Sequence, residues 1–177
     1  GSLGASSINN AVLKLLPRLV ANNIQVVWQT GETDYEQMKA EADRMMKVSG
    51  GTIMVHKFIE RMDHAYATCD LAVCRAGATT VAELAGAGVA SILVPYPYAA
   101  ADHQTENAKA MVESGAAVMI RDPELGGKLL TTIEALLADP TMLQVMRTNA
   151  LEVGNPEATG VLARAVVNLA RGEHGRA

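Results

Sequence analysis

DLAVCRAGATTVAELAGAG, residues 70–88, contains the signals of a strand, a turn and a helix in succession. Residues 70–74 are an apolar run with the length of a buried strand, a glycine follows, and residues 79–87 have the small-residue composition of a helix. Thr79 or Thr80 is expected to cap this helix. The first N–H groups of a helix have no intrahelical partner and attract anions, so we expect an anion to bind beyond the strand end.

Glu83 lies one turn further along the same predicted helix. Its carboxylate can reach the space above the strand and accept hydrogen bonds from a diol, as the acidic residue of dinucleotide-binding folds does with ribose. The alternative is an exposed helix glutamate that binds nothing. Its spacing from Thr79 and Thr80 favours the ribose interpretation.

Strand-like and helix-like patterns alternate on both sides of this unit. Besides 70–74, strands are expected at 24–28, 52–55, 91–94 and 116–120. Besides 79–87, helices are expected at 6–20, 35–47, 62–67, 103–114, 128–137, 141–153 and 157–171. This order predicts an α/β fold, a Rossmann-like doubly wound parallel sheet with helices on both faces and a helical C-terminus.

The 177 residues fit one domain, expected over 1–171, with a disordered tail at 172–177. The glycine loop at 1–5 runs into a helix and is a candidate phosphate cradle, although Gly1-Ser2 can also be an expression remnant. In a doubly wound fold this loop follows a strand. None precedes it, so the first strand of the sheet is expected to be missing.

All parallel strands point the same way, so the loops that follow them lie along one edge of the sheet. Open sheets of this kind bind ligands outside that edge. We therefore expect one cleft to be lined by five loops, at 1–5, 29–31, 56–59, 75–80 and 96–104.

Composition argues against several other kinds of protein. The net charge is −4 and no basic cluster is present, so a nucleic-acid partner is not expected. Cys69 and Cys74 have neither redox nor zinc spacing and are expected to be reduced core residues. No apolar run has the length of a transmembrane helix, so membrane contact is not expected through this chain.

The remaining polar candidates follow strands. Gln104 and Asn107 share a helix face, so their amides can bind hydroxyls or the N-acetyl group of a sugar. His103 lacks an evident carboxylate partner for base chemistry, and Asp102 is a plausible helix cap. Arg75 can pair with a diphosphate or form a buried structural ion pair. The pattern of histidines and carboxylates predicts neither a metal site nor a self-contained hydrolase.

Five segments, in this order, resemble the donor-binding C-terminal domain of the MurG family, glycosyltransferase family 28, which has the GT-B fold. They are GSLGA at 1–5, WQTG at 28–31, FIERM at 58–62, CRAGATTVAEL at 74–84 and VPYPYAAADHQTENA at 94–108. The resemblance covers nearly the whole chain. It also implies that the family's first strand of this domain, and the acceptor-binding domain, are missing from it.

The resemblance implies a role for each matching residue. The diphosphate would contact Ser2 and the helix start at Ala78, Thr79 and Thr80; Glu83 would hold the ribose hydroxyls. Uracil would meet the Phe58-Ile59 segment and Met62. The alternative for the apolar pair Phe58-Ile59 is burial in the core. The sugar would be read by Gln104 and Asn107, with His103 standing where the family often has glutamine.

The function implied is donor binding in the enzyme that transfers N-acetylglucosamine from UDP-GlcNAc to undecaprenyl-pyrophosphoryl-MurNAc-pentapeptide (lipid I). The product is lipid II, in peptidoglycan synthesis and hence in cell-wall growth, cell shape and division. The whole enzyme would be cytoplasmic and peripheral on the inner membrane face, and would use no cofactor. Since the acceptor domain of the family holds the proposed base, no catalytic residue is expected here.

Other functions fit the same fold. The chain can belong to another GT-B enzyme with a different UDP-sugar, or to a UDP-GlcNAc 2-epimerase, which needs acid–base carboxylates near the sugar. It can also be a non-catalytic donor-binding subunit that a partner chain completes.

Overall fold

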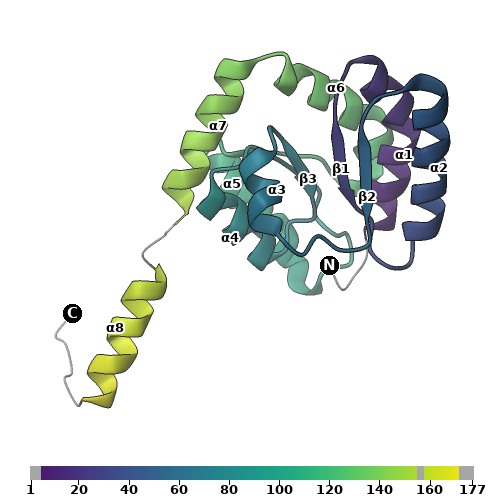
Figure 1. Ribbon diagram of the computed structural model, residues 1–177. Helices are drawn as coiled ribbons and strands as arrows, with labels where there is room; N and C mark the ends of the chain where they lie inside the picture. Colours follow the sequence, from purple (N-terminus) through teal and green to yellow (C-terminus); the bar gives the residue numbers. More distant parts are fainter. Residues whose placement is uncertain (1–4, 155–157, 172–177) are drawn as a thin grey trace.

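The structure, a computed structural model, describes residues 5–154 and 158–171 (Figure 1). Its strands are β1 (Val26–Gln29), β2 (Ile53–His56), β3 (Ala72–Cys74), β4 (Ser91–Leu93) and β5 (Ala117–Met119). Its helices are α1 (Ser6–Ala21), α2 (Tyr35–Ser49), α3 (Met62–Thr68), α4 (Ala78–Ala87), α5 (His103–Glu113), α6 (Leu125–Leu137), α7 (Pro140–Val153) and α8 (Ala158–Ala170). Strands and helices alternate up to β5, and the chain is then helical. The predicted α/β class and the helical C-terminal part are confirmed.

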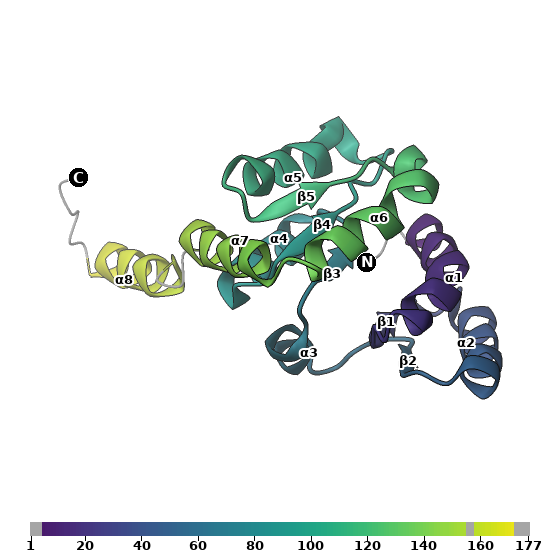
Figure 2. The same cartoon turned by 90° about the horizontal axis from the view of Figure 1, so that it is seen from above.

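The strands form two parallel sheets instead of the single sheet expected. β1 pairs with β2, and β4 lies between β3 and β5. In both views β1 lies between β2 and β3, but β1 and β3 do not hydrogen-bond to each other (Figures 1 and 2). The break between the two sheets therefore falls between β1 and β3. The division of the strands into two separate sheets was not predicted.

Helices cover both faces of the β3–β5 sheet, as a doubly wound fold requires. Successive residues of β4 point to opposite faces. Ile92 packs in a core cluster with residues of α1, α6 and α7, and Leu93 packs in a second cluster with residues of α4 and α5. Both side chains are fully buried. This explains why all three residues of β4 are buried and neither face of the strand is exposed.

A third core cluster joins the smaller sheet to α1 and α2. Trp28 and Val55, one from each strand, pack against Leu16 of α1 and Met38 and Ala42 of α2. The outer faces of these strands are open, because Val27 and Met54 are nearly half exposed. β1 and β2 therefore have the alternating burial of strands covered on one face, unlike β4.

Most predicted boundaries agree with the structure to within about two residues. The largest difference is α6, which begins at Leu125, three residues before the predicted start, after a short 3₁₀ turn at Asp122–Glu124. Gly126 and Gly127 have low helix propensity, but burial of Leu125 and Leu129 in the core holds this segment in the helix. A second 3₁₀ turn, Ala100–Asp102, precedes α5.

α8 lies away from both sheets in both views, and in Figure 2 it lies next to the end of α7 (Figures 1 and 2). Among its described side chains, Val166, Val167 and Leu169 are exposed. No described helix combines the length and the apolar character that crossing a bilayer requires. The predicted disordered tail, 172–177, lies outside the described residues.

Candidate functional site

The first turn of α1 connects the carboxyl ends of both sheets. The Ser7 hydroxyl donates a hydrogen bond to Asp122 after β5 and accepts one from Arg75 after β3, both at 2.7 Å. The Asn9 amide donates to the carbonyl of Thr30, just after β1, at 2.9 Å. The ends of three strands therefore meet around the start of α1. Two of them begin loops that were expected to line the cleft, 29–31 and 75–80, whereas the segment after β5 was not among the five expected loops.

The first N–H groups of α4 are available to an anion. Gly77, not a threonine, occupies the N-cap position, and no side chain caps this helix end. The prediction that Thr79 or Thr80 caps the helix is therefore wrong: the helix begins at Ala78, so both threonines lie inside its first turn. Ala78 and Thr79 are exposed and Thr80 is half-buried. This first turn contains no acidic residue that would repel an anion.

Glu83 lies on α4, within two turns of that helix end, and its side chain is exposed. Its Oε2 accepts a hydrogen bond of 2.9 Å from the Tyr66 hydroxyl of α3. Burial, together with the neighbouring Glu83, raises the pKa of Tyr66, so the phenol stays protonated and acts as the donor. Glu83 is thus the acceptor, and it is open to solvent for further donors.

The loop that follows β2 is fixed to the end of β1. The backbone N–H of Ile59 donates to Oε1 of Gln29 at 2.9 Å. Ile59 and Met62 are half-buried. Phe58, for which burial in the core was the other interpretation, is 68% exposed. These apolar side chains stand at the same strand-end edge as Gln29, where a planar base can lie against them.

Arg75 forms the buried ion pair that was the alternative to diphosphate binding. Its guanidinium pairs with Asp122 and also donates to the carbonyls of Val94 and Pro95 at 3.3 and 3.2 Å. The Arg75 and Asp122 side chains are 14% and 17% exposed. Nε of Arg75 is buried without a partner, and these contacts do not support a diphosphate role.

Each of the two candidate sugar-binding amides uses one of its polar groups in a hydrogen bond to the backbone. Oε1 of Gln104 accepts from the N–H of Tyr96 at 2.9 Å, and Nδ2 of Asn107 donates to the carbonyl of Ala76 at 3.0 Å. Gln104 therefore keeps its NH₂ donor and Asn107 keeps its carbonyl acceptor. Together they offer the two polar functions that an N-acetyl group or a pair of hydroxyls requires.

The loop before these amides has an uncommon backbone. Ala101 and Asp102 both have positive φ, 46° and 55°. Asp102 is at the N-cap position of α5 as predicted, but its carboxylate accepts from the Thr105 hydroxyl at 2.6 Å and not from a backbone N–H. His103 begins the helix and is exposed. Left-handed conformations at non-glycine residues are concentrated at functional sites.

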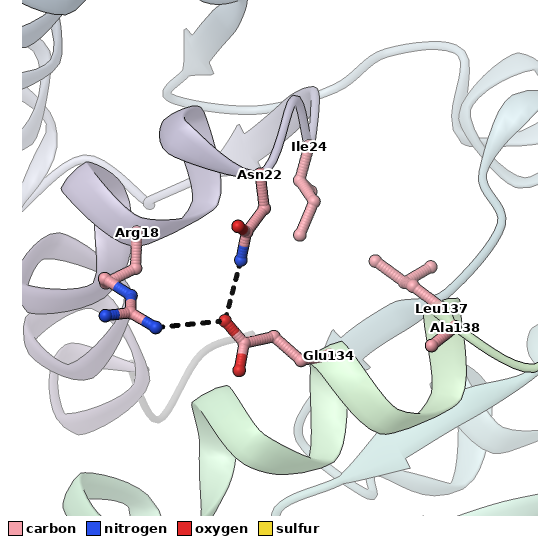
Figure 3. A pocket seen from close by; sticks show the side chains of 6 residues that line it. All are labelled: Arg18, Asn22, Ile24, Glu134, Leu137 and Ala138. Carbon is pink, nitrogen blue, oxygen red and sulfur yellow. Dashed lines mark hydrogen bonds and ion pairs between the residues drawn. The ribbon is translucent and has the colours of Figure 1, made fainter.

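Two depressions lie at opposite ends of α1. The larger, about 440 Å³, is lined by Arg18, Asn22, Ile24, Glu134, Leu137 and Ala138 (Figure 3). Its polar side chains bond to one another, since Glu134 accepts from Asn22 at 2.7 Å and lies 3.8 Å from Arg18. The smaller, about 260 Å³, lies at the strand-end edge and is lined by Ser6, Ser7, Arg75, Tyr96, Pro97, Tyr98 and Asp122. The smaller depression is the one at the candidate site.

Four residues with roles at this edge were not predicted. Ser7 and Asn9 gave only a helical signal, and Asp122 lies 47 residues from its partner Arg75. Tyr66 was part of a predicted helix with no assigned role. The residues around Tyr66 give no sign that it contacts Glu83, which lies 17 residues later in the sequence.

The described residues contain no group of three metal-binding side chains close together. Cys69 and Cys74 are both free and half-buried, and burial raises the pKa of Cys74 to about 12. Ser2, the remaining candidate, lies outside the described residues.

Known proteins of similar sequence and fold identify the family of this chain. Residues 1–160 match the glycosyltransferase family 28 C-terminal domain. Proteins named UDP-N-acetylglucosamine--N-acetylmuramyl-(pentapeptide) pyrophosphoryl-undecaprenol N-acetylglucosamine transferase are similar: that of Chlorobium phaeobacteroides is 43% identical over 97% of this chain and 46% of its own length. That of Myxococcus xanthus is 44% identical over 96% of this chain and 44% of its own length.

Solved structures show the same relationship. The crystal structure of Acinetobacter baumannii MurG superposes with a TM-score of 0.80 at 34% identity, covering 95% of this chain and 50% of that one. A glycosyltransferase of kitacinnamycin, 17% identical with a TM-score of 0.51, shares the fold alone. The chain spans about half the length of the relatives it matches. By the family match over most of its length, the chain belongs to the glycosyltransferase family 28 C-terminal domain family.

Proposed function

We propose that this chain is the UDP-GlcNAc-binding half of an enzyme that transfers N-acetylglucosamine to lipid I. The observation that carries the proposal is the pairing, on α4, of an uncapped helix start with an exposed glutamate at the edge where strand ends converge. An anion site and a diol acceptor so close together suit a nucleoside diphosphate. The names of the relatives supply the sugar and the acceptor.

In this proposal the N–H groups of Ala78, Thr79 and Thr80, together with Ser2, bind the diphosphate. Ile59 and Met62 contact uracil, and Glu83 accepts from the ribose hydroxyls. Gln104 and Asn107 bind the sugar with the polar groups that the backbone leaves free. His103, exposed at the start of α5, lies at the sugar end of the site.

The proposed reaction is displacement of UDP from the anomeric carbon by a hydroxyl of lipid I, with inversion. The bond from that carbon to the β-phosphate oxygen breaks, and negative charge accumulates on the departing diphosphate. The start of α4 stabilises that charge. The proposal assigns no catalytic base and no cofactor to this chain. The proposal places acceptor and membrane contacts, on the cytoplasmic side, outside this chain.

The proposal is tested by titrating UDP-GlcNAc into the 177-residue chain in a calorimeter, with Glu83→Ala as the test variant. Loss of hydrogen bonds to a charged acceptor costs about 1.5–3 kcal/mol, so binding is expected to weaken at least tenfold. Glu113→Ala, which removes another exposed glutamate from the far end of α5, is the matched control and is expected to leave affinity unchanged. Equal affinity of the Glu83→Ala variant and the parent chain contradicts the ribose assignment.

Competition between UDP-sugars for the chain distinguishes the proposed donor from the donors of other GT-B enzymes. UDP-GlcNAc is expected to bind more tightly than UDP-glucose, because the N-acetyl group can use the free polar groups of Gln104 and Asn107. Tighter binding of UDP-glucose would favour another GT-B enzyme. Interconversion of UDP-GlcNAc with its 2-epimer by the chain would favour the epimerase.

A further inference from the structure

Tyr66 connects two helices through a single polar contact. The residue lies on α3, which packs against α4, and its ring contacts the core cluster that contains Leu84 and Ala85 of α4. The ring is half-buried, while its hydroxyl reaches out to Oε2 of Glu83 at 2.9 Å. The donor is therefore anchored in the core, and the acceptor is an exposed side chain.

The contact leaves Glu83 able to bind a diol. An ionised carboxylate has about four acceptor positions on its two oxygens. The Tyr66 hydroxyl uses one of them on Oε2, so Oε1 and a second position on Oε2 remain. Two adjacent hydroxyls need two acceptors, and the carboxylate still has them while bound to Tyr66.

The contact also limits the motion of the carboxylate. An exposed glutamate samples many rotamers, and fixing such a side chain at the moment of binding reduces affinity. A hydrogen bond from a ring held in the core restricts those rotamers before the ligand arrives. The phenol is a reliable donor because burial and the neighbouring Glu83 raise the pKa of Tyr66.

We propose that Tyr66 is a positioning residue that holds the Glu83 carboxylate in the orientation that accepts the ribose hydroxyls of the nucleotide. The inference rests on the proposed function, because it assigns to Tyr66 a role in the same donor site. It adds α3 to the elements that shape the site. It also predicts that Tyr66 contributes to recognition of the ribose and not of the base or the diphosphate.

The experiment measures the affinity of the 177-residue chain for UDP and for 2′-deoxy-UDP, in the parent chain and in Tyr66→Phe. Phenylalanine keeps the ring and its packing and removes only the hydroxyl. UDP binding is expected to weaken about threefold to tenfold, because the Glu83 side chain, no longer held by Tyr66, must then be ordered when the ligand binds. Binding of 2′-deoxy-UDP is expected to change less than twofold, so the preference for UDP falls.

Tyr35→Phe is the matched control. Tyr35 is also half-buried, but its ring lies under the Lys57 ammonium, and it is assigned no part in the site. This variant is expected to keep both affinities. Circular dichroism and thermal melting of each variant check that the fold is retained.

The outcomes separate the inference from the proposed function. If Tyr66→Phe weakens UDP and 2′-deoxy-UDP equally, or neither, Tyr66 does not position the ribose acceptor and the inference is overturned. If Glu83→Ala abolishes the preference for UDP while Tyr66→Phe retains it, the inference fails and the proposed function stands. If the parent chain does not prefer UDP over 2′-deoxy-UDP, both fail.

Discussion

Arg75 and Asp122 illustrate how one buried pair can fix the edge of a binding site. Arg75 follows β3 and Asp122 follows β5, and the two side chains meet beside Ser7 of α1. A carboxylate that is mostly buried next to a guanidinium cannot be removed without leaving a poorly solvated cation. Arg75 therefore positions strand ends around the site without being assigned to the ligand.

We expect Asp122→Ala to lower the free energy of unfolding by about 3 kcal/mol, because it leaves the Arg75 guanidinium buried without its counter-ion. The measurement is the midpoint of urea unfolding, compared between variants whose m-values are the same. Asp70→Ala is the control: Asp70 pairs with Arg147 at 3.1 Å, but its side chain is 76% exposed, so the expected cost is below about 1 kcal/mol. Similar costs for the two variants would mean that Arg75 does not depend on Asp122.

A buried polar residue of α1, Asn9, helps to hold this helix in position, in addition to its apolar face. Asn9 is 1% exposed and accepts from Nε1 of Trp28 at 2.9 Å. Its Nδ2 donates to the carbonyl of Thr30 and to the Asp34 carboxylate, at 2.9 and 2.7 Å. One amide thus connects α1 to β1 and to the start of α2. This network holds the loop after β1, from which Gln29 supports Ile59.

Asn9→Ala is expected to destabilise the chain by about 2–4 kcal/mol, because it leaves the Trp28 N–H and the Thr30 carbonyl buried without partners. Trp28 is the only tryptophan in the chain, so its fluorescence reports both the local change and unfolding in urea. Asn10→Ala alters the exposed neighbour and is expected to change stability by less than about 0.5 kcal/mol. A loss below 1 kcal/mol for Asn9→Ala would show that water replaces the network.

The elements themselves were largely predictable, because their apolar spacing follows their burial. Leu16 and Leu19 of α1, and Ile92 of β4, lie where the periodic pattern placed them. Caps and long-range polar contacts were not predictable to the same degree. Gly77 occupies the N-cap position of α4 in place of a threonine. Asp122 becomes part of the site edge because β5 ends at the same edge of the sheet as β3, next to the start of α1. Tertiary packing determines which residues form these contacts, so the residues next to them in the sequence do not reveal the contacts.

Two strand edges and one helix are left open at the scale of the whole molecule. Within the part of the chain that the structure describes, β1 and β3 each pair on one edge only, and the described side chains of α8 are largely exposed. Unpaired strand edges are sites where another strand can add. The relatives are about twice as long as the chain, so these surfaces need not be exposed in a protein of that length.

The two-sheet arrangement predicts an alternating pattern of amide exchange. In a parallel pair, alternate residues of a strand donate to the neighbour. The N–H of Val26 donates to Thr52 and that of Thr30 to His56, so the N–H of Val27 points away from β2. By the same reasoning, Ala72 donates to Ala90 and the N–H of Val73 points away from β4.

Exchange of the Val27 and Val73 amides, followed by NMR in the 177-residue chain, is expected to be at least about a hundredfold faster than exchange at Val26 and Ala72. β4 is the internal control: it pairs on both edges, so successive amides of this strand are expected to be protected alike. Strong protection at Val27 and Val73 would contradict the separation of the sheets, since it requires a partner on the free edges of β1 and β3. Repeating the measurement at several protein concentrations would then distinguish pairing with a second copy, which increases with concentration, from pairing within one chain.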